Sequence, residues 1–412
     1  MSSSPTEGPI VRHRRVFYIP GYDPIHPRRY RELYRKESAA QAEISGYSLT
    51  LRPKTTKGPY GWHIEAEQDG QATGTDMEVL YWSDIVRDSM ASSIPATYLQ
   101  LVWTASAYIF SGALFRLMRL RKGPVIAALY PVGMLLLQLA LCCLVGWGLG
   151  RLVQLGVAQV VPMAAPWVGL AVGLAVIWAG LRWFKSKDAK LFAYYLMHDY
   201  SFSARTLGAN SPALEARMAE FADTIAEALK TDAGEVLVVG HSSGAHLAVS
   251  ILSDLIRDER VPADGPVLSF LSLGQVVPMV SFLPRAKRLR ADLAYLSARP
   301  ELTWVDVTAP GDGCAFALCD PVAVTGVAPA DKQWPLVFSA AFTQTLSPER
   351  WKELRWRFFR LHFQYLCAFD RPGDYDYFRI TAGPLTLAGR YAGRPPSKTR
   401  IETPVNRFRS MA

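Results

Sequence analysis

Two long runs without a charged residue constrain this 412-residue chain more than any other feature of its sequence. Residues 123–150 and residues 152–181 contain no Asp, Glu, Lys or Arg, and only Arg151 separates them. A helix crosses the hydrocarbon core of a bilayer with about 20 apolar residues. Because each run exceeds that length, the sequence predicts a hairpin of two membrane spans, near residues 124–148 and 160–181.

The charges beside these runs predict how the hairpin is oriented. Four basic residues precede the first span and four follow the second, whereas the turn between the spans carries only Arg151. The flanking residues are Arg116, Arg119, Arg121, Lys122, Arg182, Lys185, Lys187 and Lys190. Under the positive-inside rule both flanks stay on the cytoplasmic side. We therefore expect an integral protein of the cytoplasmic (inner) membrane, with the rest of the chain on its cytoplasmic side.

A third uncharged segment, residues 89–115, has a less apolar composition. Pro95, Thr97, Gln100 and several further Ser and Thr residues interrupt it. This composition suits a helix on the membrane surface or against the hairpin at least as well as a third span. An odd number of spans would place the two halves of the chain on opposite sides of the membrane, so we count two.

Outside the hairpin, short apolar runs alternate with helical segments. The runs predicted to be strands are residues 15–21, 47–53, 61–68, 78–82, 235–240, 267–274 and 302–307, with the second and third paired as a hairpin. Most of these runs are continuous stretches of β-branched and aromatic residues, which suit strands covered on both faces. The predicted fold class is therefore α/β, with a mainly parallel sheet and helices on both of its faces.

Together these patterns predict one α/β domain interrupted by a helical membrane insertion. The first part of the domain is expected over residues 10–85, the insertion over 86–204 and the second part over 205–390. Residues 391–412 are polar, contain proline and carry almost no acid, so we expect a disordered basic tail.

The formal net charge of +9 is explained by where the basic residues lie. Many of them flank the uncharged runs or belong to the tail, and the sequence has no helix-turn-helix, zinc-finger or single-strand-binding motif. Attraction to anionic lipid head groups accounts for this placement. We therefore expect the lipid bilayer as a partner and no nucleic acid.

The stretch VLVVGHSSGAHLAV, residues 236–249, places Gly-x-Ser-x-Gly between a predicted strand and a predicted helix. Gly240 and Gly244 allow strand and helix to approach closely around Ser242, whose hydroxyl would be exposed at the turn. The N–H of Ser243 would lie at the start of the helix, where it can donate to a developing oxyanion. Here GHSSGAHLA resembles the nucleophile elbow of the esterases, lipases and amidases of the α/β-hydrolase superfamily.

This resemblance implies a catalytic triad in the chain order serine, acid, histidine. Of the seven histidines only His362 follows the last predicted strands, so it is the expected base. Asp312 is the expected acid because it lies in the loop just after the strand 302–307, and Asp320 in the same loop is the alternative. Asp306 lies inside the strand and is expected to be a structural residue.

A second oxyanion donor is expected from the loop after the first core strand. The backbone N–H groups of Gly21 and Tyr22, in the stretch IPGYDP, are the candidates. Pro-Gly-Tyr-Asp is also an ordinary turn sequence, and it lacks the His-Gly pair that many α/β-hydrolases carry there.

The resemblance implies a membrane-anchored serine hydrolase, lipase-like or esterase-like, that cleaves an ester-type bond through an acyl-enzyme on Ser242. The same triad would serve a thioesterase, an amidase or an acyltransferase, and a catalytically inactive membrane-anchored scaffold is the remaining alternative. Five cysteines show no zinc-ligand spacing, so neither a metal nor an organic cofactor is expected.

The position of the insertion indicates the kind of substrate. It leaves the predicted sheet after the strand 78–82, at the edge where ligands bind in open α/β sheets. The catalytic mouth is therefore expected to face the membrane, and a lipidic or amphiphilic ester to be the substrate. The basic segment 277–293 is either a lid that meets lipid head groups or a helix exposed to solvent.

Overall fold

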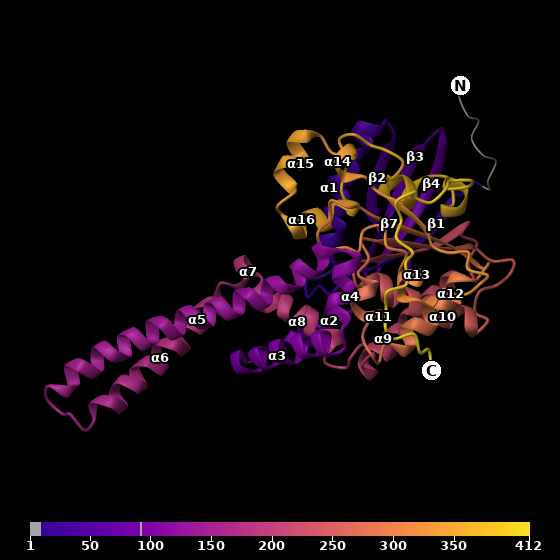
Figure 1. Cartoon of the computed structure of the whole chain (residues 1–412). Helices are drawn as coiled ribbons and strands as arrows, with labels where there is room; N and C mark the ends of the chain where they lie inside the picture. Colours follow the sequence, from indigo (N-terminus) through magenta and orange to yellow (C-terminus); the bar gives the residue numbers. More distant parts are fainter. Residues whose placement is uncertain (1–9, 91–92) are drawn as a thin grey trace.

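The computed structural model describes residues 10–90 and 93–412, which form an α/β core with a projecting helical hairpin (Figure 1). The strands are β1 (His13–Ile19), β2 (Ser48–Pro53), β3 (Gly61–Gln68), β4 (Gln71–Val79), β5 (Glu235–His241), β6 (Val267–Leu273), β7 (Leu302–Thr308) and β8 (Leu336–Ser339). They form one mixed sheet in the order β2-β3-β4-β1-β5-β6-β7-β8. The strands from β4 to β8 in this order run parallel, and β2 and β3 are antiparallel additions at one edge. The predicted α/β class with a mainly parallel sheet is therefore confirmed.

The helices divide between the core and the insertion. The core helices are α1 (Arg28–Ser45), α9 (Pro212–Ala228), α10 (Gly244–Arg257), α11 (Val277–Ser281), α12 (Lys287–Ser297), α13 (Pro321–Thr325), α14 (Phe342–Thr345), α15 (Pro348–Leu354), α16 (Phe358–His362), the 3₁₀ helix η1 (Gln364–Leu366), α17 (Tyr377–Ala382) and α18 (Leu387–Arg390). The insertion holds α2 (Ser83–Met90), α3 (Ile94–Phe110), α4 (Ala113–Leu120), α5 (Lys122–Ala158), α6 (Ala165–Ser186), α7 (Asp188–Leu191) and α8 (Ala193–Ala204).

Alternate residues of the central strands serve two hydrophobic cores. Phe17 and Val238 belong to the core under α9, α10 and α12, whereas Val16 and Val239 belong to the core under α1 and the C-terminal helices. All four side chains are fully buried. Burial on both faces explains why these strands read as continuous apolar runs in the sequence.

The chain changes direction in the sheet between β1 and β5. After β1 the chain crosses to β2 at one edge and returns through β3 to β4 beside β1, and after β5 it adds β6, β7 and β8 in turn on the other side. Such a switch point leaves a crevice beyond the carboxyl ends of the two strands, where ligands bind in open α/β sheets. The residues that follow β1 and β5 therefore occupy the expected place for a site.

The helices α5 and α6 are each long and apolar enough to cross a membrane. The helix α5 contains the predicted span 124–148 and extends beyond it at both ends, whereas α6 begins five residues after the start of the predicted span 160–181 and ends five residues after it. The helices α3 and α4 meet at a bend of 72° and would make a third span only if the bent pair is counted as one. Figure 1 shows α5 and α6 projecting side by side from the core, with α3, α7 and α8 near their root.

Two segments differ from the sequence prediction. The tail 391–412 packs along the core instead of being free: Ile401 exchanges backbone hydrogen bonds with Leu318 and Asp320, and the side chain of Asn406 is buried. In addition, Ile401 and Val405 pack against a buried apolar cluster and the Asn406 amide donates to the Ser281 carbonyl oxygen, and the basic composition of the tail conceals these contacts.

The basic segment 277–293 is largely part of the core. The Arg290 side chain is fully buried and donates to four backbone carbonyls, those of Ser281, Leu283, Pro284 and Ser410. Arg288 forms ion pairs with Glu215, Asp254 and Asp292. These two arginines are therefore engaged inside the protein and do not form a lid toward lipid head groups.

Glycines set the distance between α5 and α6. A Cβ atom on Gly146 would lie 2.7 Å from the carbonyl oxygen of Gly173, and one on Gly150 would lie 2.5 Å from that of Gly169. These four residues form one small-xxx-small pattern on each helix, the pattern that lets membrane helices pack backbone to backbone. Gly148 lies between the two contacts, yet a Cβ on it would meet nothing within 4 Å.

We predict that Gly150→Ala destabilises the protein and that Gly148→Ala does not. The new methyl group at residue 150 forces the helices apart, and such overpacking costs about 1–3 kcal/mol. Alanine at residue 148 has space and favours the helix. Thermal unfolding of both variants in lipid nanodiscs measures the difference, and equal stability would show that close glycine packing does not hold the hairpin together.

Candidate active site

A sharp turn between β5 and α10 presents Ser242. Its φ is +57°, a left-handed conformation that costs a non-glycine residue of order 1–3 kcal/mol and is retained mainly at functional sites. A Cβ on Gly240 would lie 2.7 Å from the Cα of Ala245, and one on Gly244 would lie 2.1 Å from the carbonyl oxygen of Ile19. Both glycines of the motif are therefore required by the close approach of strand, helix and the end of β1.

The structure brings the predicted base and acid into direct contact. The Nδ1 atom of His362 lies 2.7 Å from Oδ2 of Asp312, which as a carboxylate accepts the Nδ1–H. The same carboxylate accepts hydrogen bonds from the Tyr365 hydroxyl (3.0 Å) and the Cys314 N–H (2.9 Å). Burial by itself raises the pKa of Asp312, but His362 and these donors outweigh it and hold the pKa below its usual value.

The other two aspartates of this region have structural roles. Asp320 caps α13 by accepting the N–H groups of Val322 and Ala323, and it pairs with Lys332 at 2.7 Å. Asp306 is buried within β7 and bonds to the Ser272 hydroxyl, and burial raises its pKa to about 8. Among the three candidates, Asp312 is the one that contacts the imidazole.

The second nitrogen of His362 faces the site. Nε2 is buried and has no hydrogen-bond partner among the residues the structure describes. Because Asp312 accepts the Nδ1 proton, Nε2 of the neutral ring is the basic nitrogen. Ser242 and His362 line the same two cavities, although no hydrogen bond joins their side chains in the described part of the chain. Such bonds are often long in unliganded sites and shorten when substrate binds.

His241 packs against His362 and helps to hold it in place. Its ring stacks on the His362 ring with centroids 4.9 Å apart, and its Nε2 lies 3.0 Å from the His362 carbonyl oxygen. Its Nδ1 lies 3.2 Å from the Tyr18 hydroxyl. Burial, together with the nearby His362, lowers the pKa of His241 to about 3, so it is a neutral positioning residue. This contact could not be predicted from the sequence, because His241 and His362 are 121 residues apart in the chain.

The predicted oxyanion donors lie around Ser242. The N–H of Ser243 has no hydrogen-bond partner within residues 10–90 and 93–412. A Cβ on Gly21 would be 3.0 Å from the Cβ of Ser242, which places this loop against the elbow. The N–H of Tyr22 donates to the Ser243 hydroxyl at 2.9 Å, so it would have to exchange that partner for a substrate oxygen.

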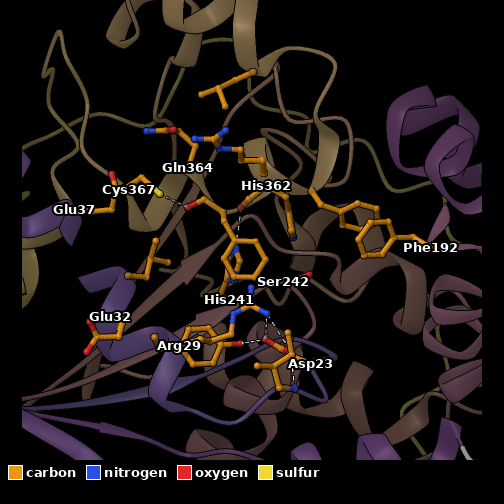
Figure 2. A pocket seen from close by; sticks show the side chains of 18 of the residues that line it. Asp23, Arg29, Glu32, Glu37, Phe192, His241, Ser242, His362, Gln364 and Cys367 are labelled. Atoms are coloured by element: carbon orange, nitrogen blue, oxygen red, sulfur yellow. Dashed lines mark hydrogen bonds and ion pairs between the residues drawn. The ribbon is translucent and has the colours of Figure 1, made fainter. Parts of the chain in front are cut away.

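Two cavities meet at Ser242. The larger one, of about 1430 Å³, is open and is lined by parts of α1, α7, α8, α15 and α16. Figure 2 shows Asp23, Arg29, His241, Ser242 and His362 around it. The smaller one, of about 90 Å³, lies under the membrane insertion and is lined mainly by apolar and aromatic side chains.

Two residues of the site were not expected from the sequence. Asp199 of α8 lines both cavities, and Cys314 lines the smaller one. Asp312, Cys314 and His362 together offer three possible metal-ligand atoms within 4.8 Å of one another. A thiol binds metal as a thiolate, but burial raises the pKa of Cys314 well above its usual value. Because His362 Nδ1 already bonds to Asp312, the cluster fits a triad better than a metal site. Asp199 is the single acid in the stretch AYYLMHDYSFSA, but nothing in that stretch indicates that it reaches the site.

No protein-family model matches this chain, and comparisons with curated proteins and with solved structures find no match either.

We predict that Gly274→Ala slows any reaction of Ser242 by at least about tenfold through displacement of the base. Gly274 has a φ of +53°, and a Cβ there would lie 2.7 Å from Cε2 of Tyr365 and 3.1 Å from Cε1 of His362. Gly70→Ala is the matched control, because Gly70 has a φ of +72° and open space around it. Covalent labelling of Ser242 by a fluorophosphonate measures the rate. Equal slowing of labelling in Gly274→Ala and Gly70→Ala would show that the loss comes from alanine in a left-handed conformation and not from displacement of His362.

Proposed function

We propose that this protein is a membrane-anchored serine hydrolase of the α/β-hydrolase superfamily that cleaves ester bonds through an acyl-enzyme. The observation that carries the proposal is that Ser242, held in a strained turn, lines the same cavity as His362, whose ring is hydrogen-bonded to the buried Asp312. A nucleophile, a base with a free nitrogen and an acid that orients the base are the parts that acyl transfer needs.

In the proposed reaction, Nε2 of His362 takes the hydroxyl proton of Ser242 as Oγ attacks the ester carbonyl carbon. The Asp312 carboxylate stabilises the imidazolium, and the Ser243 N–H stabilises the oxyanion. Collapse of the tetrahedral intermediate breaks the carbon–oxygen bond, and the leaving alcohol takes the proton from His362. Water then attacks the acyl-enzyme with His362 as base, which releases the carboxylic acid and restores Ser242.

The mouth of the larger cavity carries features of a membrane interface. Trp356, between α15 and α16, is 72% exposed, and Phe358, the first residue of α16, is 47% exposed. Arg355, Arg357 and Arg360 flank them. Phe359 packs against Phe192, which follows the hairpin in the chain, with ring centroids 5.4 Å apart. Aromatic and basic residues together suit the head-group region. This arrangement supports a lipidic or amphiphilic ester that enters from the bilayer.

We predict that Ser242→Ala and His362→Ala abolish fluorophosphonate labelling of the membrane-embedded protein. Asp312→Asn is expected to slow labelling by about 10³- to 10⁴-fold, because the imidazole loses its orienting acceptor. Asp320→Asn should label at nearly the wild-type rate, since asparagine also caps a helix.

Mass spectrometry of the labelled peptide identifies the modified residue. If the folded wild-type protein does not react with the probe, the inactive scaffold is favoured. If Asp320→Asn loses labelling and Asp312→Asn keeps it, Asp320 and not Asp312 is the acid of the triad.

We also predict that the double variant Trp356→Glu/Phe358→Glu loses about tenfold in the hydrolysis of a long-chain fluorogenic ester dissolved in anionic vesicles. Two added carboxylates oppose insertion into the head-group region. Hydrolysis of a soluble acetate ester should change little, because neither side chain lines the cavities. Val267→Glu, at an exposed apolar residue at the start of β6, is the matched control. Equal loss on both substrates would contradict a role in membrane contact.

A further inference from the structure

The smaller cavity is built jointly by the core and the membrane insertion. The core supplies Ser242, His362, Val276 and other residues of the elbow region, and the insertion supplies side chains from α3, α5 and α8. Its aromatic residues are Tyr22, Trp82, Tyr108, Tyr200, Phe202 and Phe359. An apolar cavity of about 150 Å³ holds one benzene molecule, so this cavity of about 90 Å³ holds a group of only a few non-hydrogen atoms. A long acyl chain does not fit there, whereas a small polar head or a short acyl group does.

Asp199 is the one Asp, Glu, Lys or Arg residue among the side chains that line this cavity. Asp199 is partly buried, and within residues 10–90 and 93–412 its side chain makes no hydrogen bond and no ion pair. Burial raises the pKa of Asp199 to about 7, and the nearby His362 opposes this rise only in part. His246, which also lines the cavity, cannot neutralise the carboxylate, because burial lowers the pKa of His246 to about 4. The protein thus keeps an acid beside its reactive serine without a cation to match it.

We propose that this cavity binds a small organic ammonium group on Asp199, so that the substrate is an ester whose smaller part carries a positive charge. The inference rests on the proposed serine hydrolase function. An ammonium group pairs with the carboxylate, and the surrounding rings attract the same charge through their π faces. The pair formed on binding offsets the burial of the carboxylate, which an apolar acyl group could not do.

The two cavities then divide the substrate. The ammonium-bearing part occupies the smaller cavity, and the larger, lipid-soluble part occupies the open cavity of about 1430 Å³ at the proposed membrane mouth. The same ammonium chemistry is found in an aminoacyl group esterified to a lipid alcohol and in a choline-type alcohol esterified to an acyl chain. These two sources place the cation on opposite sides of the scissile bond.

The test compares charged esters with neutral substrates of nearly the same shape. A choline ester is paired with its 3,3-dimethylbutyl analogue, in which carbon replaces the nitrogen, and an alanyl ester is paired with the propionyl ester of the same alcohol. The wild type is expected to prefer the charged member of at least one pair. In Asp199→Asn the ratio of kcat/KM for charged over neutral substrate should fall at least about tenfold. The pair that shows the effect identifies the source of the cation.

Asp258→Asn is the control for loss of a negative charge, since Asp258 is exposed at the far end of α10 from the elbow. It should leave the ratio as in the wild type. The inference is overturned if Asp199→Asn changes neither ratio, or if it lowers kcat/KM equally for charged and neutral substrates.

A binding measurement separates this inference from the proposed function. Calorimetric titration of Ser242→Ala protein in nanodiscs with tetramethylammonium and with methylammonium needs no turnover. We expect Ser242→Ala to bind at least one of these cations and Ser242→Ala/Asp199→Asn to bind it at least about tenfold more weakly. This result would support the ammonium site even if the wild type showed no hydrolysis. Equal affinity in the two proteins, or no binding to either, would overturn the site even if fluorophosphonate labelling established the hydrolase.

Discussion

The parallel pairing of β1 and β5 is the contact on which the rest of the structure depends. Arg14 and Glu235, 221 residues apart in the chain, are partners in register and form an ion pair with both side chains fully buried. Arg14 also donates to two backbone carbonyls, and Glu235 also accepts from the Ser269 hydroxyl and the Leu387 N–H. A shift of β1 against β5 by one residue would leave buried charges unpaired, which costs about 3–5 kcal/mol. The same register places Gly21 beside Ser242, just beyond the carboxyl ends of β1 and β5 and at the other end of the strands from this ion pair.

The insertion is joined to the candidate site as well as to the core. A Cβ on Gly123 of α5 would lie 3.1 Å from the Gly313 carbonyl oxygen, beside Asp312. In α8, the Tyr195 hydroxyl donates to the Tyr22 carbonyl oxygen at 2.5 Å and so holds the candidate oxyanion loop. The helices that lead into and out of the hairpin therefore position residues on both sides of Ser242. Removal of the insertion would expose the smaller cavity and free both loops, so the candidate site and the insertion form one structural unit.

The sequence predicted the parts of the fold whose signals are local. The apolar runs of β1, β5, β6 and β7, the hairpin of β2 and β3 and the two long apolar helices each carry their own pattern. The strand β8 was missed because its four residues, with Pro335 just before them, are too short to show a period. The packed tail was missed because its contacts are made by single residues such as Asn406 within a basic stretch.

The candidate site shows the same division between local and distant information. Ser242 follows from its motif, and chain order together with loop position singled out His362 and favoured Asp312. The contact of Asp312 with the imidazole, against the capping role of Asp320, depends on how the loop after β7 folds. Asp199 lies 43 residues before Ser242 in the chain and reaches the site only because α8 packs back against the core. No local pattern distinguishes it from a solvated acid.

The position of Asp199 also bears on what the insertion contributes to the candidate site. An ionised carboxylate inside an apolar and aromatic cavity lowers the stability of the folded protein unless it takes up a proton or a cation joins it. The residues that build this cavity come from α3, α5 and α8 as well as from the core, so the charge can be held there only while the insertion is in place. The larger cavity opens beside Phe192 and Phe359, at the root of the same hairpin. One element thus supplies part of the wall of the smaller cavity and, in the proposed function, brings the site to the membrane that would contain the large part of the substrate.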